Sequence, residues 1–75
     1  MVGQLKNKRL LLQISSKLKE VRNAKGLTQE EVFNDTAIHL ARIETGKVNV
    51  SISTLKALCE YFNISLTDFF EKVES

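Results

Sequence analysis

Residues 26–47 read GLTQEEVFNDTAIHLARIETGK, and this stretch decides the fold because it predicts two short helices joined by a tight turn. Thr28 and Glu31 have the capping-box spacing that starts a helix. Thr36 follows two turn-forming residues and is placed to cap the next helix. Gly46 ends that helix and completes the predicted helix-turn-helix unit.

The spacing of apolar residues predicts helices on both sides of this unit. The first starts within residues 7–14 and ends near Lys25, where Gly26 follows as a C-cap. Serines at 51 or 53 and at 65 are placed to cap two further helices. The apolar stripes, in chain order, are Leu11, Ile14, Leu18 and Val21; Val32 and Phe33; Leu40 and Ile43; Ile52, Leu55, Leu58, Cys59 and Phe62; and Leu66, Phe69, Phe70 and Val73. No alternating strand pattern occurs, so we predict an all-α domain of five short helices.

The composition is that of one small globular domain, with 75 residues of which 43% are apolar and 27% are charged. Cys59 is the only cysteine, which excludes a disulfide or a cysteine-based zinc site within one chain and fits a reducing compartment. No apolar run approaches the roughly 18–20 residues that cross a bilayer, and residues 1–13 make a poor signal peptide. We therefore expect a cytoplasmic protein without a metal or cofactor.

Basic side chains gather in the first third of the chain. Residues 1–29 hold seven Lys and Arg against one acid, whereas residues 30–75 hold four against eight. This asymmetry favours contact between one end of the domain and phosphates, although a solvated helix face explains the same charges equally well. One histidine, one cysteine and the lack of an acid–base cluster argue against an enzyme.

The predicted helices carry residues that resemble the Xre/Cro/phage-repressor helix-turn-helix family. The matching segments are LKEVRNAKGLTQEEV, ARIETGK and NVSISTLKALCEYFNISLTDFF, within Ile14–Phe70. The resemblance implies a five-helix, lambda-repressor-like DNA-binding domain over residues 14–75, preceded by a basic N-terminal extension over residues 1–13. It also implies an ion pair inside the domain between Arg22 and Glu44, which would fix the third helix against the first.

The chain departs from this family between its second and third helices. Family members usually carry about three more residues there, commonly an apolar-Gly-apolar turn, where this chain has Asn34-Asp35-Thr36. Two orientations of Ile38 therefore stay open, one facing DNA and one filling the core.

The resemblance places the reading surface on the helix expected at residues 36–45, whose outer side would enter the major groove. Arg42 is the leading base reader because its guanidinium can donate two hydrogen bonds to guanine. A phosphate or a nearby acid is the alternative partner for this side chain. The base-reading set as a whole is Thr36, Ala37, Ile38, Ala41 and Arg42.

Residues at the helix ends are expected to hold the DNA backbone. Gln29 is the leading candidate because it lies in the first turn of a helix, where free N–H groups favour anions. The phosphate-binding set is Thr28, Gln29, Thr45, Lys47 and Asn49, and the flanking set is His39, Lys6, Lys8 and Arg9. For Lys47 the alternative role is solubility, and for His39 it is a ring partly buried beside the preceding helix.

Both ends of the chain offer ways to form a dimer. Residues 1–13 either form an arm along the DNA or extend the first helix and pack on a second subunit. Phe69 and Phe70 point about 100° apart on a helix, so one of them, with Val73, is expected to be an exposed dimer contact.

Together these features predict a sequence-specific DNA-binding transcriptional regulator, in the form of a homodimeric repressor on double-stranded DNA. Narrower versions are an antitoxin, with a cognate toxin as partner, and a controller protein of a restriction system. The alternative from another class is a protein-interaction adaptor, in which Ala37, Ile38 and Ala41 face a partner protein.

Overall fold

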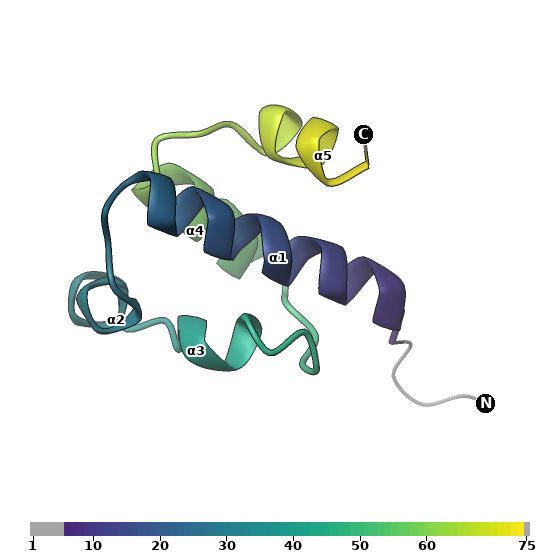
Figure 1. Cartoon of the computed structure of the whole chain (residues 1–75), viewed down its shortest axis with the longest axis horizontal. Helices are drawn as coiled ribbons and strands as arrows, with labels where there is room; N and C mark the ends of the chain where they lie inside the picture. The colour runs from purple at the N-terminus through teal and green to yellow at the C-terminus, as the bar shows by residue number, and fades with distance from the viewer. Residues whose placement is uncertain (1–5, 75) are drawn as a thin grey trace.

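The computed structural model describes residues 6–74, with side chains for residues 6–73. This part of the chain forms α1 (Lys8–Ala24), α2 (Gln29–Thr36), α3 (Leu40–Ile43), α4 (Ile52–Tyr61) and α5 (Leu66–Glu74). Figure 1 shows α1 crossing the middle of the molecule, with α5 on one side, α2 and α3 on the other, and α4 behind. The prediction of an all-α fold is confirmed. Of the helices described, none combines the length and apolar character that spanning a bilayer requires.

α1 begins at Lys8 because Asn7 caps it. The Asn7 side-chain oxygen accepts a hydrogen bond from the Leu10 N–H (3.0 Å). The chain from Lys8 onward is therefore helical, and residues 1–5 of the expected arm lie outside the described residues. Gly26, with φ of +71°, lets the chain turn away after the helix ends.

The core joins all five helices. Its members are Ile14, Leu18, Val32, Leu40, Ile43, Leu55, Leu58, Cys59, Phe62, Phe69 and Val73. Fully burying a Leu, Val or Phe side chain stabilises the fold by about 1.5–3 kcal/mol. Val32 and Leu40 are almost completely buried, so they anchor the two short helices α2 and α3 to the rest of the domain.

The connection between α2 and α3 differs from the prediction. Thr36 is the last residue of α2, where its hydroxyl donates to the Val32 carbonyl (2.7 Å) and accepts from the Ile38 N–H (3.1 Å). Ala37 then adopts a left-handed conformation with φ of +62°, and α3 starts only at Leu40. The predicted helix start at Thr36 is therefore wrong, because the threonine hydroxyl closes the end of α2 instead of capping α3.

One turn of helix remains in α3. It spans Leu40–Ile43, and a helical turn takes about 3.6 residues. The shortfall of about three residues relative to the family pattern is therefore close to one lost turn. Ala37 occupies the left-handed position that glycine commonly fills in such turns.

The loop after α3 runs close to the start of α1. Gly46 is buried with φ of +74°, and a Cβ there would lie 2.7 Å from Leu12 Cδ2. A glycine at this position lets the loop pass directly against α1. α4 then starts after Ser51, whose side-chain oxygen accepts a hydrogen bond from the Thr54 N–H (3.0 Å).

Candidate nucleic-acid interface

A buried hydrogen-bond network fixes the end of α3 against α1. Arg22 Nε lies 2.8 Å from Glu44 Oε2, and Arg22 Nη2 lies 3.1 Å from Glu44 Oε1. The two side chains are only 10% and 4% exposed. The hydrogen bond to Glu44 raises the pKa of Arg22, and burial opposes that rise. Arg22 Nη1 also donates to the Leu27 carbonyl (2.8 Å), so one guanidinium holds both the end of α3 and the turn before α2.

Gln29 belongs to the same network. Its Nε2 donates to Glu44 Oε1 (2.7 Å), and its side chain is half-buried. One donor of the Gln29 amide is thus bonded to a carboxylate of its own chain, and the expected contact of Gln29 with a DNA phosphate stays a prediction. The neighbouring candidate Thr28 forms the predicted capping box, in which its Oγ1 accepts from the Glu31 N–H (3.1 Å) and Glu31 Oε1 accepts from the Thr28 N–H (2.9 Å). Both residues therefore position helices within the domain.

The outer edge of α3 is open to solvent. Ala41 and Arg42 are exposed on α3, and Ala37 and His39 are exposed just before it. Within residues 6–74 the Arg42 guanidinium has no hydrogen-bond or ion-pair partner, so the acidic partner considered above is not present in this part of the chain. Three of the five expected base readers thus lie on this edge.

The other two expected base readers lie behind the edge. Thr36 ends α2, and Ile38 packs against the core as a half-buried side chain. Of the two orientations open for Ile38, the structure has the one that faces the core. A groove of about 410 Å³ runs beside α3, and its lining includes Ala37, Ile38, His39, Arg42, Val48 and Thr54. Fewer side chains reach the outer edge than the sequence predicts, because α3 spans only Leu40–Ile43 and not the expected residues 36–45.

Phe33 is more exposed than its place in the predicted α2 stripe implies. It is 41% exposed, and its ring centroid lies 4.7 Å from that of His39, with the ring planes tilted by 33°. The prediction that Phe33 is buried is wrong, because Val32 takes the inward position and adjacent residues point about 100° apart on a helix. His39 does lie against α2, as its alternative role proposed, but the residue remains exposed.

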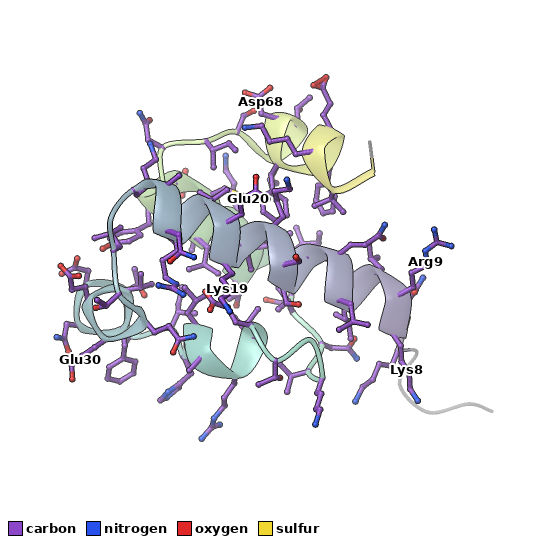
Figure 2. The ribbon with its side chains drawn as sticks, in the orientation of Figure 1. Lys8, Arg9, Lys19, Glu20, Glu30 and Asp68 are labelled. Carbon is purple, nitrogen blue, oxygen red and sulfur yellow. The ribbon has the colours of Figure 1, made fainter. Side chains whose placement is uncertain are left out.

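Lysines from two distant segments meet beside the loop after α3. Lys6 Nζ donates to the Lys47 carbonyl (3.2 Å), and Lys6, Lys8 and Lys47 line one groove of about 450 Å³. Figure 2 shows Lys8 at the end of α1 nearest this loop, whereas Asp68 lies on α5 toward the opposite side of the molecule. A basic groove therefore lies beside the loop that follows α3.

The flanking candidate Arg9 and the phosphate-binding candidates Thr45 and Asn49 lie in different surroundings. Arg9 is exposed and extends from the same end of α1, away from the loop (Figure 2). The Thr45 hydroxyl donates to the Arg42 carbonyl (2.6 Å) and accepts from the Lys47 N–H (3.2 Å), so it closes the end of α3. Asn49 is exposed in the loop that leads to α4.

The apolar side of α5 is part of the core. Phe69 and Val73 are buried, and Phe70 is half-buried with its ring edge-to-face against Phe69 at 5.5 Å between centroids. This corrects the expectation that a phenylalanine and Val73 form an exposed dimer contact, because α5 packs its apolar side against α1 and α4.

Neither a metal cluster nor a reactive thiol accompanies this surface in the part of the chain that the structure describes. No three His, Cys, Asp or Glu side chains among the described residues gather as metal ligands. Cys59 is fully buried, and burial raises the pKa of its thiol, which keeps the sulfur protonated at neutral pH.

Comparison with known proteins identifies the family. A helix-turn-helix family model matches residues 18–69, which run from the middle of α1 into α5. No curated protein and no solved structure gives a significant match. The matched segment covers more than half of the chain and contains α2, the turn, α3 and the network that anchors α3. The chain therefore belongs to the Xre-type helix-turn-helix family, whose domains bind DNA and are non-catalytic.

Proposed function

We propose that this protein is a sequence-specific transcriptional regulator that binds double-stranded DNA as a homodimer, with α3 in the major groove. The observation that carries the proposal is the outer edge of α3, where Arg42 is exposed without a partner among residues 6–74. No internal hydrogen bond has to break when this guanidinium meets a base edge. Its two parallel donors match O6 and N7 of a guanine.

Small side chains beside Arg42 support close approach to the bases. Ala37 and Ala41 are exposed on the same edge and have only a methyl group beyond the backbone. Methyl groups of this kind contact the C5-methyl of thymine in the major groove. The edge therefore favours a site with guanine opposite Arg42 and thymines beside it.

The basic groove supports the orientation of the domain on the duplex. Lys6, Lys8 and Lys47 bring three ammonium groups to one groove, and no acid among residues 6–74 lines it. Each phosphate that such a cation neutralises steepens the dependence of log K on log salt by about 0.9. Thr45 also lines this groove, and the exposed residues Arg9 and Asn49 are further supporting backbone contacts in this proposal.

A one-turn helix needs a second half-site. α3 has four residues, which at about 1.5 Å per residue span roughly 6 Å, or about two base steps of 3.4 Å each. So short a reading surface discriminates weakly as a monomer. Two copies related by a two-fold axis double the number of bases read and fix the spacing between half-sites.

Selection of binding sites from random DNA, followed by gel shifts across a salt series, tests this proposal. We expect an inverted repeat with half-site centres about 34–36 Å apart or a multiple of that distance. Arg42→Ala should weaken specific binding by about 5- to 150-fold at the guanine position. Lys8→Gln should instead make the salt dependence shallower for every sequence, while Lys56→Gln, on α4 outside the basic groove, leaves it unchanged.

Other outcomes separate the narrower roles. A tight protein partner recovered together with specific DNA binding would favour an antitoxin, and a palindrome next to a restriction gene would favour a controller protein. No DNA affinity at low salt, with a tight protein partner recovered instead, would overturn the proposal in favour of an adaptor.

A further inference from the structure

A second group of exposed side chains lies next to the edge of α3, and the inference drawn from it rests on the proposed function. We propose that Phe33 and His39 form a base-reading pair beside Arg42. In this arrangement the Phe33 ring contacts the C5-methyl of a thymine, and the His39 imidazole hydrogen-bonds to the edge of a neighbouring purine. The pair supplies part of the reading surface that the short α3 lacks.

The geometry of the pair carries this assignment. The rings of Phe33 and His39 lie against each other in a tilted arrangement with centroids 4.7 Å apart, although both residues are exposed. His39 lies three residues before Arg42, nearly one helical turn away, and lines the same groove. Within residues 6–74 the imidazole nitrogens have no hydrogen-bond partner, so they are available to a base edge. Packing against Phe33 restricts the rotation of the imidazole and holds it beside α3.

The loss of a turn explains why an aromatic ring is exposed here. Only three residues, 37–39, connect α2 to α3, so no helical turn precedes Leu40 to cover this side of α2. Val32 is completely buried while the adjacent Phe33 is 41% exposed. The ring therefore lies beside the place where a longer reading helix would begin. An apolar ring in that place can contact thymine methyl groups, which project into the major groove.

Two of the three acids of α2 are engaged within the domain. The Asp35 carboxylate accepts a hydrogen bond from the Tyr61 hydroxyl (2.5 Å) and is directed toward α4. Glu31 is occupied in the capping box with Thr28. Glu30 projects from the side of α2 that lies away from α3 (Figure 2). On α3 itself the exposed charge among the described residues is Arg42, which attracts the duplex.

Single-group changes in the DNA test the pair. In the site selected by the intact protein, each thymine is replaced by deoxyuridine, which lacks only the methyl group, and each purine by its 7-deaza analogue, which lacks the N7 acceptor. At the thymine that Phe33 reads, we expect deoxyuridine to weaken wild-type binding about fourfold, as for one buried methyl group, in addition to any effect at thymines beside Ala37 and Ala41. One 7-deaza purine outside the Arg42 contact should weaken it by about three- to tenfold.

Matched variants connect these losses to the two residues. Phe33→Ala should lose the methyl effect at one thymine position and keep it at thymines beside Ala37 and Ala41, and His39→Ala should become insensitive to the 7-deaza purine. Phe33→Leu keeps an apolar contact and should retain sensitivity to the methyl group. Ile52→Ala, which truncates a 65% exposed side chain on α4, should keep both sensitivities. Melting curves show whether each variant is folded, and His39→Ala, which truncates an exposed side chain, keeps the test decisive if Phe33→Ala is not folded.

The outcomes separate the two proposals. If the wild type binds its selected site but Phe33→Ala keeps every methyl effect of the wild type and His39→Ala still responds to the 7-deaza purine, the pair does not read bases and the regulator stands. If the wild type binds no DNA at low salt, the proposed function fails and the reading pair fails with it.

Discussion

Replacing Glu44 with alanine tests how the protein holds its reading helix. The change removes the acceptor of two hydrogen bonds from Arg22 and one from Gln29. The Arg22 side chain is 10% exposed, so its charge would stay largely buried with the Leu27 carbonyl as its remaining partner. Breaking a buried ion pair by removing one partner lowers the free energy of unfolding by about 3–5 kcal/mol. Because Arg22 keeps its bond to the Leu27 carbonyl, we expect a loss of about 3 kcal/mol.

Urea unfolding followed by circular dichroism measures this loss. A domain of this size has a free energy of unfolding of only about 4–11 kcal/mol, so a loss of about 3 kcal/mol moves the midpoint clearly. Glu44→Gln keeps the size and one acceptor oxygen, and should cost about 1–2 kcal/mol. Glu20→Ala is the surface control, because it removes an exposed pair with Lys17 (3.2 Å) and should cost less than about 1 kcal/mol. An equal loss for Glu44→Ala and Glu20→Ala would refute the reasoning that the buried pair organises the domain.

Three further changes have defined outcomes. Gly46→Ala should destabilise the domain by about 1–3 kcal/mol, because residue 46 has a positive φ and lies close to α1. Gly26→Ala should cost less, since a Cβ there meets nothing within 4 Å, and matched urea curves compare the two variants. Ala37→Gly should raise the free energy of unfolding by up to about 1 kcal/mol, since glycine adopts φ near +62° without strain; an unchanged thermal midpoint would contradict this. The hydrogen bond to Asp35 raises the pKa of Tyr61 to about 12, above its ordinary 10.0, so its stabilising effect is complete below pH 10 and disappears as the pH rises toward 12; Tyr61→Phe should flatten that part of the stability profile.

Local chemistry was enough to predict most of the helix ends. The Thr28 and Glu31 capping box starts α2 as its spacing indicates, because both partners lie within one helical turn. Gly26 and Gly46 adopt the positive φ values that follow helix ends, because a residue without a Cβ does so without strain. The apolar stripe of α1 is buried at Leu11, Ile14 and Leu18, since helical periodicity alone brings these positions onto one face.

The details of the candidate site depended on contacts that no local pattern contains. Thr36 resembles an N-cap in sequence, yet its hydroxyl bonds back into α2, so α3 starts four residues later. Gln29 looks like a free polar residue at a helix start, but Glu44, fifteen positions along the chain, takes its amide. Phe33 is exposed where burial was expected, and Val73 is buried where exposure was expected. Burial depends on which neighbouring helix covers each position.

The sequence by itself therefore determined the all-α class, the family and the ends of most helices, since these follow from caps, turn residues and apolar periodicity within a few positions. Only the tertiary structure decided the length of α3, the orientation of Ile38 toward the core and the exposure of the Phe33 and His39 rings. The physical reason is that these features depend on how α2, α3 and α1 pack around the buried Arg22–Glu44 pair, which joins residues far apart in the chain.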